Sequence, residues 1–257
     1  MKRYLLASDL DGTFIKHNDG PNNPRSILEK DIEILKQFNE EDNIFIICTG
    51  RDKASTFKLF EKHNLFLKNF YFITSSGAEI YTSDKKCIYK KVLNRELSKN
   101  VFDIFLSLND SHLVCAMFDG EVEHEIKSLE DFNKITEPII NICVFSNRNE
   151  INDTQTFYEL INRNLSKIEI TRNNWYVDII PESISKATSI QYVLKLQEDS
   201  EQIEIISIGD SWNDIPMFEI AKDSYTFNDS PVSVKEMASY TVNHFHEAIK
   251  KYIRKKL

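Results

Sequence analysis

The sequence predicts an α/β protein with a parallel-sheet core and a second α/β domain inserted into that core. Short apolar runs alternate with amphipathic stretches in the first part of the chain, and this pattern resumes near the C-terminus. The segment between these parts contains strand and helix patterns of its own and is too long for a single crossover. We therefore expect a core made of residues 1–82 and 182–257, and an inserted cap domain made of residues 83–181.

The core elements are predicted from the spacing of apolar residues. Continuous apolar runs predict buried strands at 4–8, 44–48, 70–74 and 203–208. Apolar residues that recur every three or four positions, and a basic C-terminal stretch, predict helices at 26–38, 53–63, 185–197 and 247–256. In the second of these helices, Ala54, Phe57 and Phe60 are expected to face the sheet.

The cap elements follow from the same patterns. Strands are expected at 113–118, 121–125, 141–146, 167–171 and 175–180, and helices at 97–108 and 154–164. Substrate choice is expected to lie in this domain, because the cap must cover the part of the substrate that the core does not hold. Several polar and aromatic cap residues could line the cleft, although an ordinary surface or packing role is the more frequent one for each: His112, Asp119, Arg148, Arg172, Asn173 and Trp175.

The composition narrows the class of protein. With 257 residues, 41% of them hydrophobic, and a net charge of -8, the chain is expected to be globular and mildly acidic. This charge argues against a protein that binds duplex nucleic acid. No apolar run reaches transmembrane length and no apolar signal segment precedes the first strand, so a cytoplasmic location is expected. The cysteines form no C-x-x-C pair and are expected to be reduced, buried thiols: Cys48, Cys87, Cys115 and Cys143.

The first segment that indicates chemistry is Asp9-Leu10-Asp11-Gly12-Thr13, directly after the first predicted strand. Residues i and i+2 of an extended chain point the same way, so both carboxylates are expected to face one small volume. Two acids in one cleft repel each other unless a cation or a proton intervenes, which favours a hard metal ion such as Mg²⁺. Asp9 would attack phosphorus, and Asp11 would protonate the leaving oxygen and later accept a proton from water.

Three further segments begin at predicted strand ends or helix starts. Thr49 and Gly50 follow a strand and could bind phosphate oxygens through a hydroxyl and a backbone N–H. Lys186, at the start of a helix, could offset charge in the transition state. After the strand at 203–208, Asp210 would ligate Mg²⁺ together with Asp9 and Asp11, and Asp214 would support the site. Each segment alone could be an ordinary turn, cap or surface lysine, but their order at strand ends on both sides of an insert favours one shared site.

Together these segments resemble the haloacid dehalogenase superfamily, and in particular its Cof-like sugar-phosphate phosphatase branch, which carries a large α/β cap. The matching segments extend over the whole chain: 9–13, 49–51, 75–80, 185–186 and 209–217. The resemblance implies a Rossmann-like core, Mg²⁺ dependence and hydrolysis of small phosphate monoesters. It also implies that Asn213 lies near the phosphate and that Asn228 follows the next strand. Ala187 departs from the family pattern, which usually has Gly there.

The sequence therefore predicts a Mg²⁺-dependent phosphatase of small phosphorylated metabolites, specifically sugar phosphates, that forms an aspartyl-phosphate on Asp9 and has neither a nucleic-acid nor a membrane partner. Two alternatives stay open. A phosphomutase would share the aspartyl-phosphate but return the phosphoryl group to a sugar hydroxyl. A non-catalytic phosphate-binding or regulatory protein would keep the fold without needing a second aspartate as proton donor.

Overall fold

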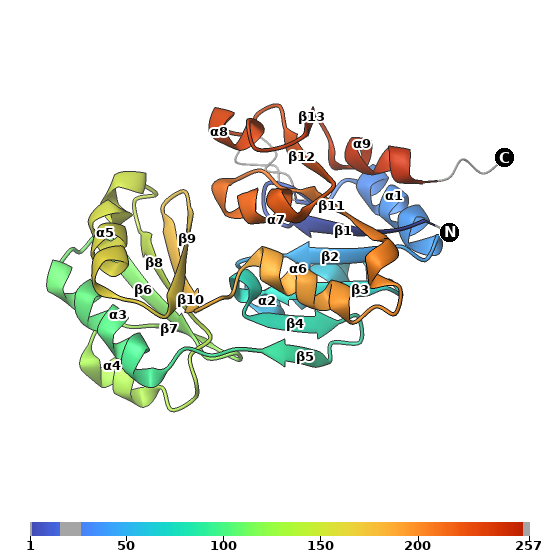
Figure 1. Cartoon of the computed structure of the whole chain (residues 1–257). Helices are drawn as coiled ribbons and strands as arrows, with labels where there is room; N and C mark the ends of the chain where they lie inside the picture. The colour runs from blue at the N-terminus through green and yellow to red at the C-terminus, as the bar shows by residue number, and fades with distance from the viewer. Residues whose placement is uncertain (1, 16–26, 254–257) are drawn as a thin grey trace.

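The computed structural model describes residues 2–15 and 27–253, and its strands form two separate sheets (Figure 1). The larger sheet has the order β13-β12-β11-β1-β2-β3-β4-β5. Neighbours from β13 to β3 are parallel, whereas β4 and β5 run antiparallel to their neighbours. Its strands are β1 (Arg3–Asp9), β2 (Ile44–Cys48), β3 (Phe70–Thr74), β4 (Glu79–Thr82), β5 (Cys87–Lys90), β11 (Ile203–Ile208), β12 (Asp223–Phe227) and β13 (Tyr240–Val242).

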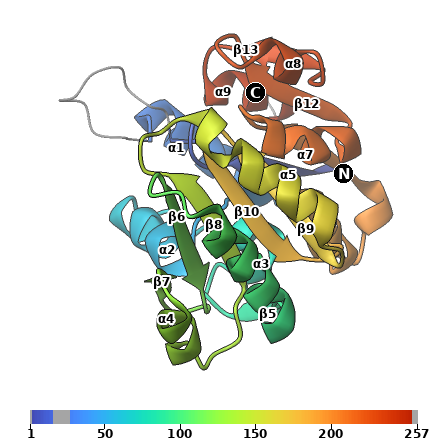
Figure 2. The ribbon, with the colours of Figure 1, turned by 90° about the vertical axis from the view of Figure 1, so that its left-hand side faces the viewer.

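The smaller sheet has the order β7-β6-β8-β10-β9, and all its neighbours are antiparallel. Its strands are β6 (Leu113–Phe118), β7 (Glu123–Glu125), β8 (Asn141–Ser146), β9 (Ile168–Asn173) and β10 (Tyr176–Pro181). Helices α3 (Arg95–Leu108) and α5 (Gln155–Asn164) lie on one face of this sheet, as Figure 2 shows, and α4 (Leu129–Lys134) lies beside them. The predicted fold class, a mainly parallel core sheet with an inserted α/β cap, is confirmed.

Helices cover both faces of the larger sheet. The face that carries Leu6 and Phe45 packs against α1 (Glu29–Glu40), α2 (Lys53–Lys62) and α9 (Phe245–Ile249). The opposite face, which carries Leu5 and Ile46, packs against α6 (Lys186–Lys195) and α7 (Ile215–Ile220). The remaining helical segments are α8 (Val232–Lys235), η1 (Ser75–Gly77), η2 (Ile151–Thr154), η3 (Ser200–Gln202), η4 (Trp212–Asp214) and η5 (Lys250–Tyr252). Because β1 is buried on both faces, its apolar run is continuous and the first carboxylate comes only at its end.

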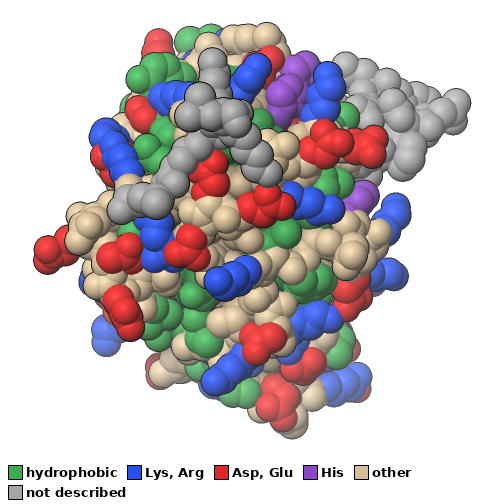
Figure 3. Space-filling model, turned by 90° about the vertical axis from the view of Figure 1, so that its right-hand side faces the viewer, with side chains coloured by type: hydrophobic (Ala, Val, Ile, Leu, Met, Phe, Trp, Pro, Cys, Tyr) green, Lys and Arg blue, Asp and Glu red, His purple; other side chains and the backbone are tan. Residues whose placement is uncertain are grey.

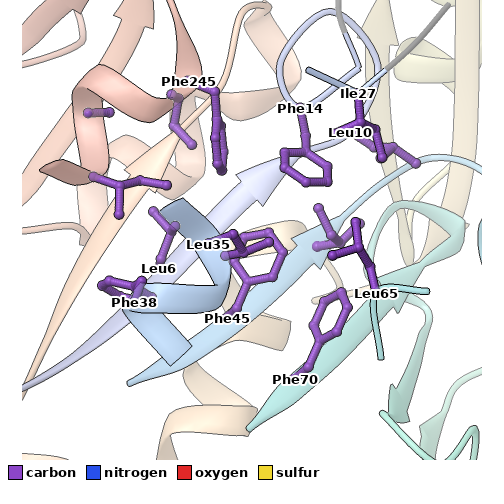
Figure 4. Close-up of a cluster of buried hydrophobic side chains, with 14 of the residues drawn as sticks. Leu6, Leu10, Phe14, Ile27, Leu35, Phe38, Phe45, Leu65, Phe70 and Phe245 are labelled. Carbon is purple, nitrogen blue, oxygen red and sulfur yellow. The ribbon is translucent and has the colours of Figure 1, made fainter. Parts of the chain in front are cut away.

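The loop after β1 is anchored in this core. Figure 4 shows Phe14 pointing into the cluster that contains Phe45 and Phe245, and the rings of Phe14 and Phe245 lie 4.8 Å apart in an edge-to-face arrangement. Phe14 is fully buried. Aromatic pairs of this kind contribute roughly 0.5–1.5 kcal/mol beyond the burial of their area. The packing of Phe14 therefore fixes the backbone of the loop that carries the first acidic segment.

Most predicted elements are observed, with four corrections. Ala54 is exposed, so α2 presents only Phe57 and Phe60 to the sheet. The predicted helix at 247–256 is wrong, because α9 ends at Ile249 and is followed by η5; residues 254–257 lie outside the described part. Cys87 is exposed on β5, at the edge of the larger sheet, and Cys143 is half-buried. The predicted helix start at residue 26 also lies outside the described residues.

The segment 83–94 joins the two sheets. Strand β5 belongs to the larger sheet although its residues fall within the predicted cap range. The division of the chain at 82/83 and 181/182 stays a prediction. On the face shown in Figure 3, acidic and basic side chains are interspersed. Within the described residues, every helix is too short or too polar to cross a bilayer.

Candidate active site

The site forms at the carboxyl ends of β1, β2 and β11. Strand β1 lies between the other two, with Ser8 beside Ile208 and Asp9 beside Cys48. The strands therefore end at nearly the same level, and the loops that follow them meet at one edge of the sheet. Open parallel sheets bind ligands at this edge.

Three carboxylates meet at this edge. Oxygen atoms of Asp9, Asp210 and Asp214 all lie within 4.8 Å of one another. Asp9 and Asp214 are buried. Burial raises the pKa of Asp9 well above its usual range, and burial together with the charge of Asp214 raises the pKa of Asp210 to about 7. Without a metal ion the ionised forms of Asp9 and Asp210 are disfavoured, which is the electrostatic situation that a bound metal ion relieves.

Lys186 provides one positive charge within this group. Its ammonium nitrogen lies 2.6 Å from Oδ1 of Asp9 and 2.7 Å from Oδ1 of Asp214, and its side chain is 3% exposed. Burial alone would lower the pKa of Lys186, but the two carboxylates outweigh burial and raise it. The lysine begins α6, where Ser185 caps the helix: its Oγ accepts from the backbone N–H of Thr188, and its own N–H donates to Thr188 Oγ1.

Close contacts between Asp214 and the backbone determine the conformation of the loop after β11. One oxygen of Asp214 accepts the backbone N–H groups of Asp210 and Ser211, at 2.9 and 3.1 Å. A Cβ atom at Gly209 would lie 2.4 Å from the carboxyl carbon of Asp214, so glycine is required there. Asp214 thus binds the loop backbone with one oxygen and Lys186 with the other.

The loop after β1 is fitted to Asp210 in the same way. Gly12 has φ +89°, and a Cβ atom there would lie 2.4 Å from Oδ2 of Asp210. The hydroxyl of Thr13 donates to Oδ1 of the same carboxylate at 2.8 Å. Gly12 therefore meets both a conformational and a steric requirement of the site.

The structure does not bring Asp11 into the group of three carboxylates. Its two oxygens bind the guanidinium of Arg51, at 2.6 Å from Nε and 2.5 Å from Nη2. The expectation that Asp9 and Asp11 face one volume assumed an extended chain. Instead β1 ends at Asp9, and the chain turns so that the backbone N–H of Gly12 donates to Ile15. A role for Asp11 as metal ligand stays a prediction.

The predicted phosphate-binding turn is supported by a second turn. The hydroxyl of Thr49, a buried residue, accepts the N–H of Arg51 at 3.1 Å, while Gly50 is exposed. The N–H groups of Ser75 and Ser76 donate to the carbonyls of Arg51 and Thr49. Both serines have left-handed backbone conformations, with φ 49° and 56°. Such conformations are strained in non-glycine residues and cluster at functional sites.

This second turn, η1, also contacts the helix of Lys186. The hydroxyl of Ser189 donates to the carbonyl of Gly77 at 2.7 Å, and a Cβ atom at Gly77 would lie 2.7 Å from the carbonyl oxygen of Ser185. Residues of η1 entered the sequence analysis only through the family resemblance. Two consecutive serines carry no chemical signal, so residue-by-residue reasoning missed this support.

A cavity of about 210 Å³ lies beside Lys186 and Asn213. It is bounded by the core and by the cap strand β9, and its lining consists of Ser76, Ile170, Thr171, Arg172, Ser185, Lys186, Trp212, Asn213 and Pro216. The side-chain oxygen of Asn213 is buried and has no hydrogen-bond partner among the described residues. Asn228 binds Asn243 through its amide and is exposed.

Two of the six cap residues named from the sequence contact this region. Arg172 lines the cavity, and Asn173 accepts a hydrogen bond from Ser211 Oγ at 2.9 Å, which joins the cap to the loop after β11. The other four make contacts elsewhere: Asp119 with His124, Arg148 with Asp153, His112 with Asp110 through its backbone, and the half-buried Trp175 with the ring of Tyr176.

Comparison of the sequence with known proteins identifies the family to which the chain is similar. Residues 6–253 match the model of the haloacid dehalogenase-like hydrolases. A putative phosphatase of Mycoplasma genitalium is 30% identical over 266 residues, which cover 93% of this chain and 90% of that protein. A Bacillus subtilis protein named 5-amino-6-(5-phospho-D-ribitylamino)uracil phosphatase is 21% identical over 93% of this chain and 92% of its own.

The fold agrees with solved structures. A structure described as a subclass IIB sugar phosphatase superposes with a TM-score of 0.75 at 19% identity, covering 97% of this chain and 98% of that one. At this identity the likeness concerns the fold, including the separate antiparallel cap sheet. The resemblance seen in the sequence is confirmed. Because the family model spans nearly the whole chain, the protein belongs to the haloacid dehalogenase-like hydrolases and is an enzyme of their phosphatase type.

Proposed function

We propose that this enzyme is a Mg²⁺-dependent phosphatase of small phosphate monoesters, with sugar phosphates as its substrate class. One observation carries the proposal: the buried ammonium of Lys186 lies between Asp9 and Asp214 in the group of three carboxylates. A buried nucleophile held by a cation beside further acids suits attack on a phosphate ester. The sugar-like substrates in the names of its relatives support the substrate class.

The donor atoms suit a hard metal ion. The group offers carboxylate oxygens only, which Mg²⁺ prefers over the nitrogen and sulfur donors that favour transition metals. Asp9, Asp210 and Asp214 would hold the ion. When bound, the ion would neutralise these carboxylates and the charge on the phosphate oxygens.

The protein residues then have separate roles. One oxygen of Asp9 attacks phosphorus, the bond to the leaving oxygen breaks, and Asp11 gives that oxygen its proton. Water next attacks the phosphorus of the aspartyl-phosphate and transfers a proton to Asp11, which releases inorganic phosphate and restores Asp9. Lys186 offsets negative charge during both steps.

A cradle beside Asp9 would hold the phosphate oxygens. We assign to it the hydroxyl of Thr49, the backbone N–H of Gly50, the ammonium of Lys186 and the side chain of Asn213. The position of Asn213 in the cavity with Lys186 supports this assignment, in which its amide nitrogen would be the donor.

A screen of phosphorylated metabolites with Mg²⁺ tests the proposal. The expected result is release of free phosphate from sugar phosphates. Conversion of a sugar phosphate into an isomer without free phosphate would identify a phosphomutase instead. Failure to hydrolyse even an aryl phosphate would contradict catalysis by this site.

A further inference from the structure

Asp178 lies on the face of the cap sheet that is turned toward the core. Along β10, Val177 and Ile179 pack into the hydrophobic core of the cap. Successive side chains of a strand point to opposite faces, so Asp178 and Ile180 point the other way. Ile180 packs with Ala78, a residue next to η1. Asp178 therefore lies where the cap meets the predicted phosphate-binding loops.

Its contacts bring Asp178 to those loops. The hydroxyl of Ser76 donates to Oδ2 of Asp178 at 3.3 Å. A Cβ atom at Gly50 would lie 3.5 Å from the same oxygen and 3.3 Å from Ser76 Oγ. The carboxylate of Asp178 therefore lies close to Gly50, whose backbone N–H is proposed to bind phosphate.

The carboxylate of Asp178 has acceptor positions left over for a ligand. Ionised carboxylates have about four acceptor positions, and a hydroxyl donor usually lies at roughly 2.7–2.8 Å, closer than Ser76 does. The thiol of Cys143, the direct partner of Asp178 in the β8–β10 register, is a second donor, and the charge of Lys186 also attracts this carboxylate. Burial raises its pKa. These two donors leave acceptor positions of Asp178 open, and its side chain is only half-buried, so a donor from a ligand can reach it.

Two neighbours of Asp178 line the cavity beside Lys186, although Asp178 itself is not among its lining residues. Thr171 is the direct partner of Asp178 in the β9–β10 register, and Ser76 is its hydrogen-bond donor. Both line the cavity of about 210 Å³ that also contains Lys186. This volume is below the roughly 300–1,000 Å³ of sites for drug-sized ligands, so it suits a compact alcohol.

We propose that Asp178 is a specificity residue that accepts a hydrogen bond from a hydroxyl group on the alcohol part of the substrate. The enzyme thereby selects phosphorylated sugars and polyols over phosphate esters that lack hydroxyls. This inference rests on the proposed phosphatase function.

The test uses two esters of equal chain length, erythritol 4-phosphate and n-butyl phosphate. The readout is the ratio of their kcat/KM values in the presence of Mg²⁺. Asp178→Ala is expected to lower this ratio by about 10- to 100-fold, the effect of losing one hydrogen bond to a charged acceptor. Asp178→Asn keeps an uncharged acceptor and should lower it less. The matched control is Glu125→Gln, an exposed cap acid on β7 paired with Lys127, which should leave the ratio unchanged.

The outcomes separate the inference from the proposed function. Equal losses on both esters would assign Asp178 a structural role between cap and core and overturn the inference. A wild-type enzyme that hydrolyses both esters without preference would overturn it too, while leaving the phosphatase function standing. A wild-type enzyme that releases phosphate from neither ester would overturn both.

Discussion

The guanidinium of Arg51 binds both carboxylate oxygens of Asp11, through Nε at 2.6 Å and Nη2 at 2.5 Å. Two-point pairing of this kind fixes the orientation of a carboxylate as well as its charge. In this conformation the second acid of the first segment is held away from the group formed by Asp9, Asp210 and Asp214. In the proposed mechanism, Asp11 therefore transfers a proton as a carboxyl group whose orientation Arg51 sets.

Replacing Arg51 tests this relationship. Arg51→Ala is expected to lower kcat with an aryl phosphate by more than about tenfold, because Asp11 loses the group that orients it. The free energy of unfolding should change by less than about 1 kcal/mol, since the pair is partly exposed. Arg51→Lys should restore only part of the activity, because a lysine ammonium cannot form a bidentate pair with the carboxylate of Asp11. An unchanged kcat in Arg51→Ala would show that Asp11 needs no such partner.

Asp210 is expected to set the metal requirement. Asp210→Ala should raise the Mg²⁺ concentration for half-maximal rate by on the order of tenfold or more, because one oxygen donor is lost. Metal titration of phosphate release measures this change. Asp103→Asn, an exposed acid on α3 paired with Lys99, serves as the control and should leave the requirement as it is. Identical titration curves for wild type and Asp210→Ala would remove Asp210 from the metal site.

The carboxylate group should make the metal-free protein less stable as pH rises. The pKa of Asp210 is raised to about 7 from an ordinary 3.8, so the folded state holds more protons than the unfolded state between these values. Stability is then lost as pH rises from about 4 to about 7. Melting temperatures in a chelator should fall across this window, and added Mg²⁺ should raise them more at pH 8 than at pH 5. Asp210→Asn should flatten the slope; a slope equal to that of the wild type would refute this assignment.

Lys186 should also be a large contributor to stability without metal. Lys186→Met leaves Asp9 and Asp214 without their shared cation, and breaking a buried ion pair in this way costs about 3–5 kcal/mol. The loss should shrink as pH falls, because the raised pKa of Asp9 allows that group to take up a proton. Denaturant unfolding in a chelator measures both effects. Lys195→Met, at the exposed end of the same helix, is the control, and equal stability of the two variants would contradict the role of Lys186.

The sequence predicted best what depends on local pattern. Strands β2 and β3 were placed residue by residue, because parallel strands buried on both faces are continuous apolar runs. Asp9 and Asp210 were expected together, because each follows a core strand and strands of a parallel sheet end at one edge. The prediction that Cys87 is buried was wrong, because β5 is an edge strand and the apolar residues around Cys87 do not make it a buried one.

Contacts made by turns and between domains could not be read from local pattern. The turn after Asp9 redirects Asp11 toward Arg51, which no alternation rule anticipates. The contact between Ser76 and Asp178 joins residues 102 positions apart, and it depends on how the cap packs on the core.

The nucleophile assignment is the central claim, and the rate of phosphate release by Asp9→Asn tests it most directly. Wild type and variant should be compared with an aryl phosphate at saturating Mg²⁺, with circular dichroism to show that both are folded. The variant is expected to lose on the order of a thousandfold or more in kcat, because an amide oxygen cannot form the aspartyl-phosphate. A folded Asp9→Asn enzyme that releases phosphate at the wild-type rate would contradict the account.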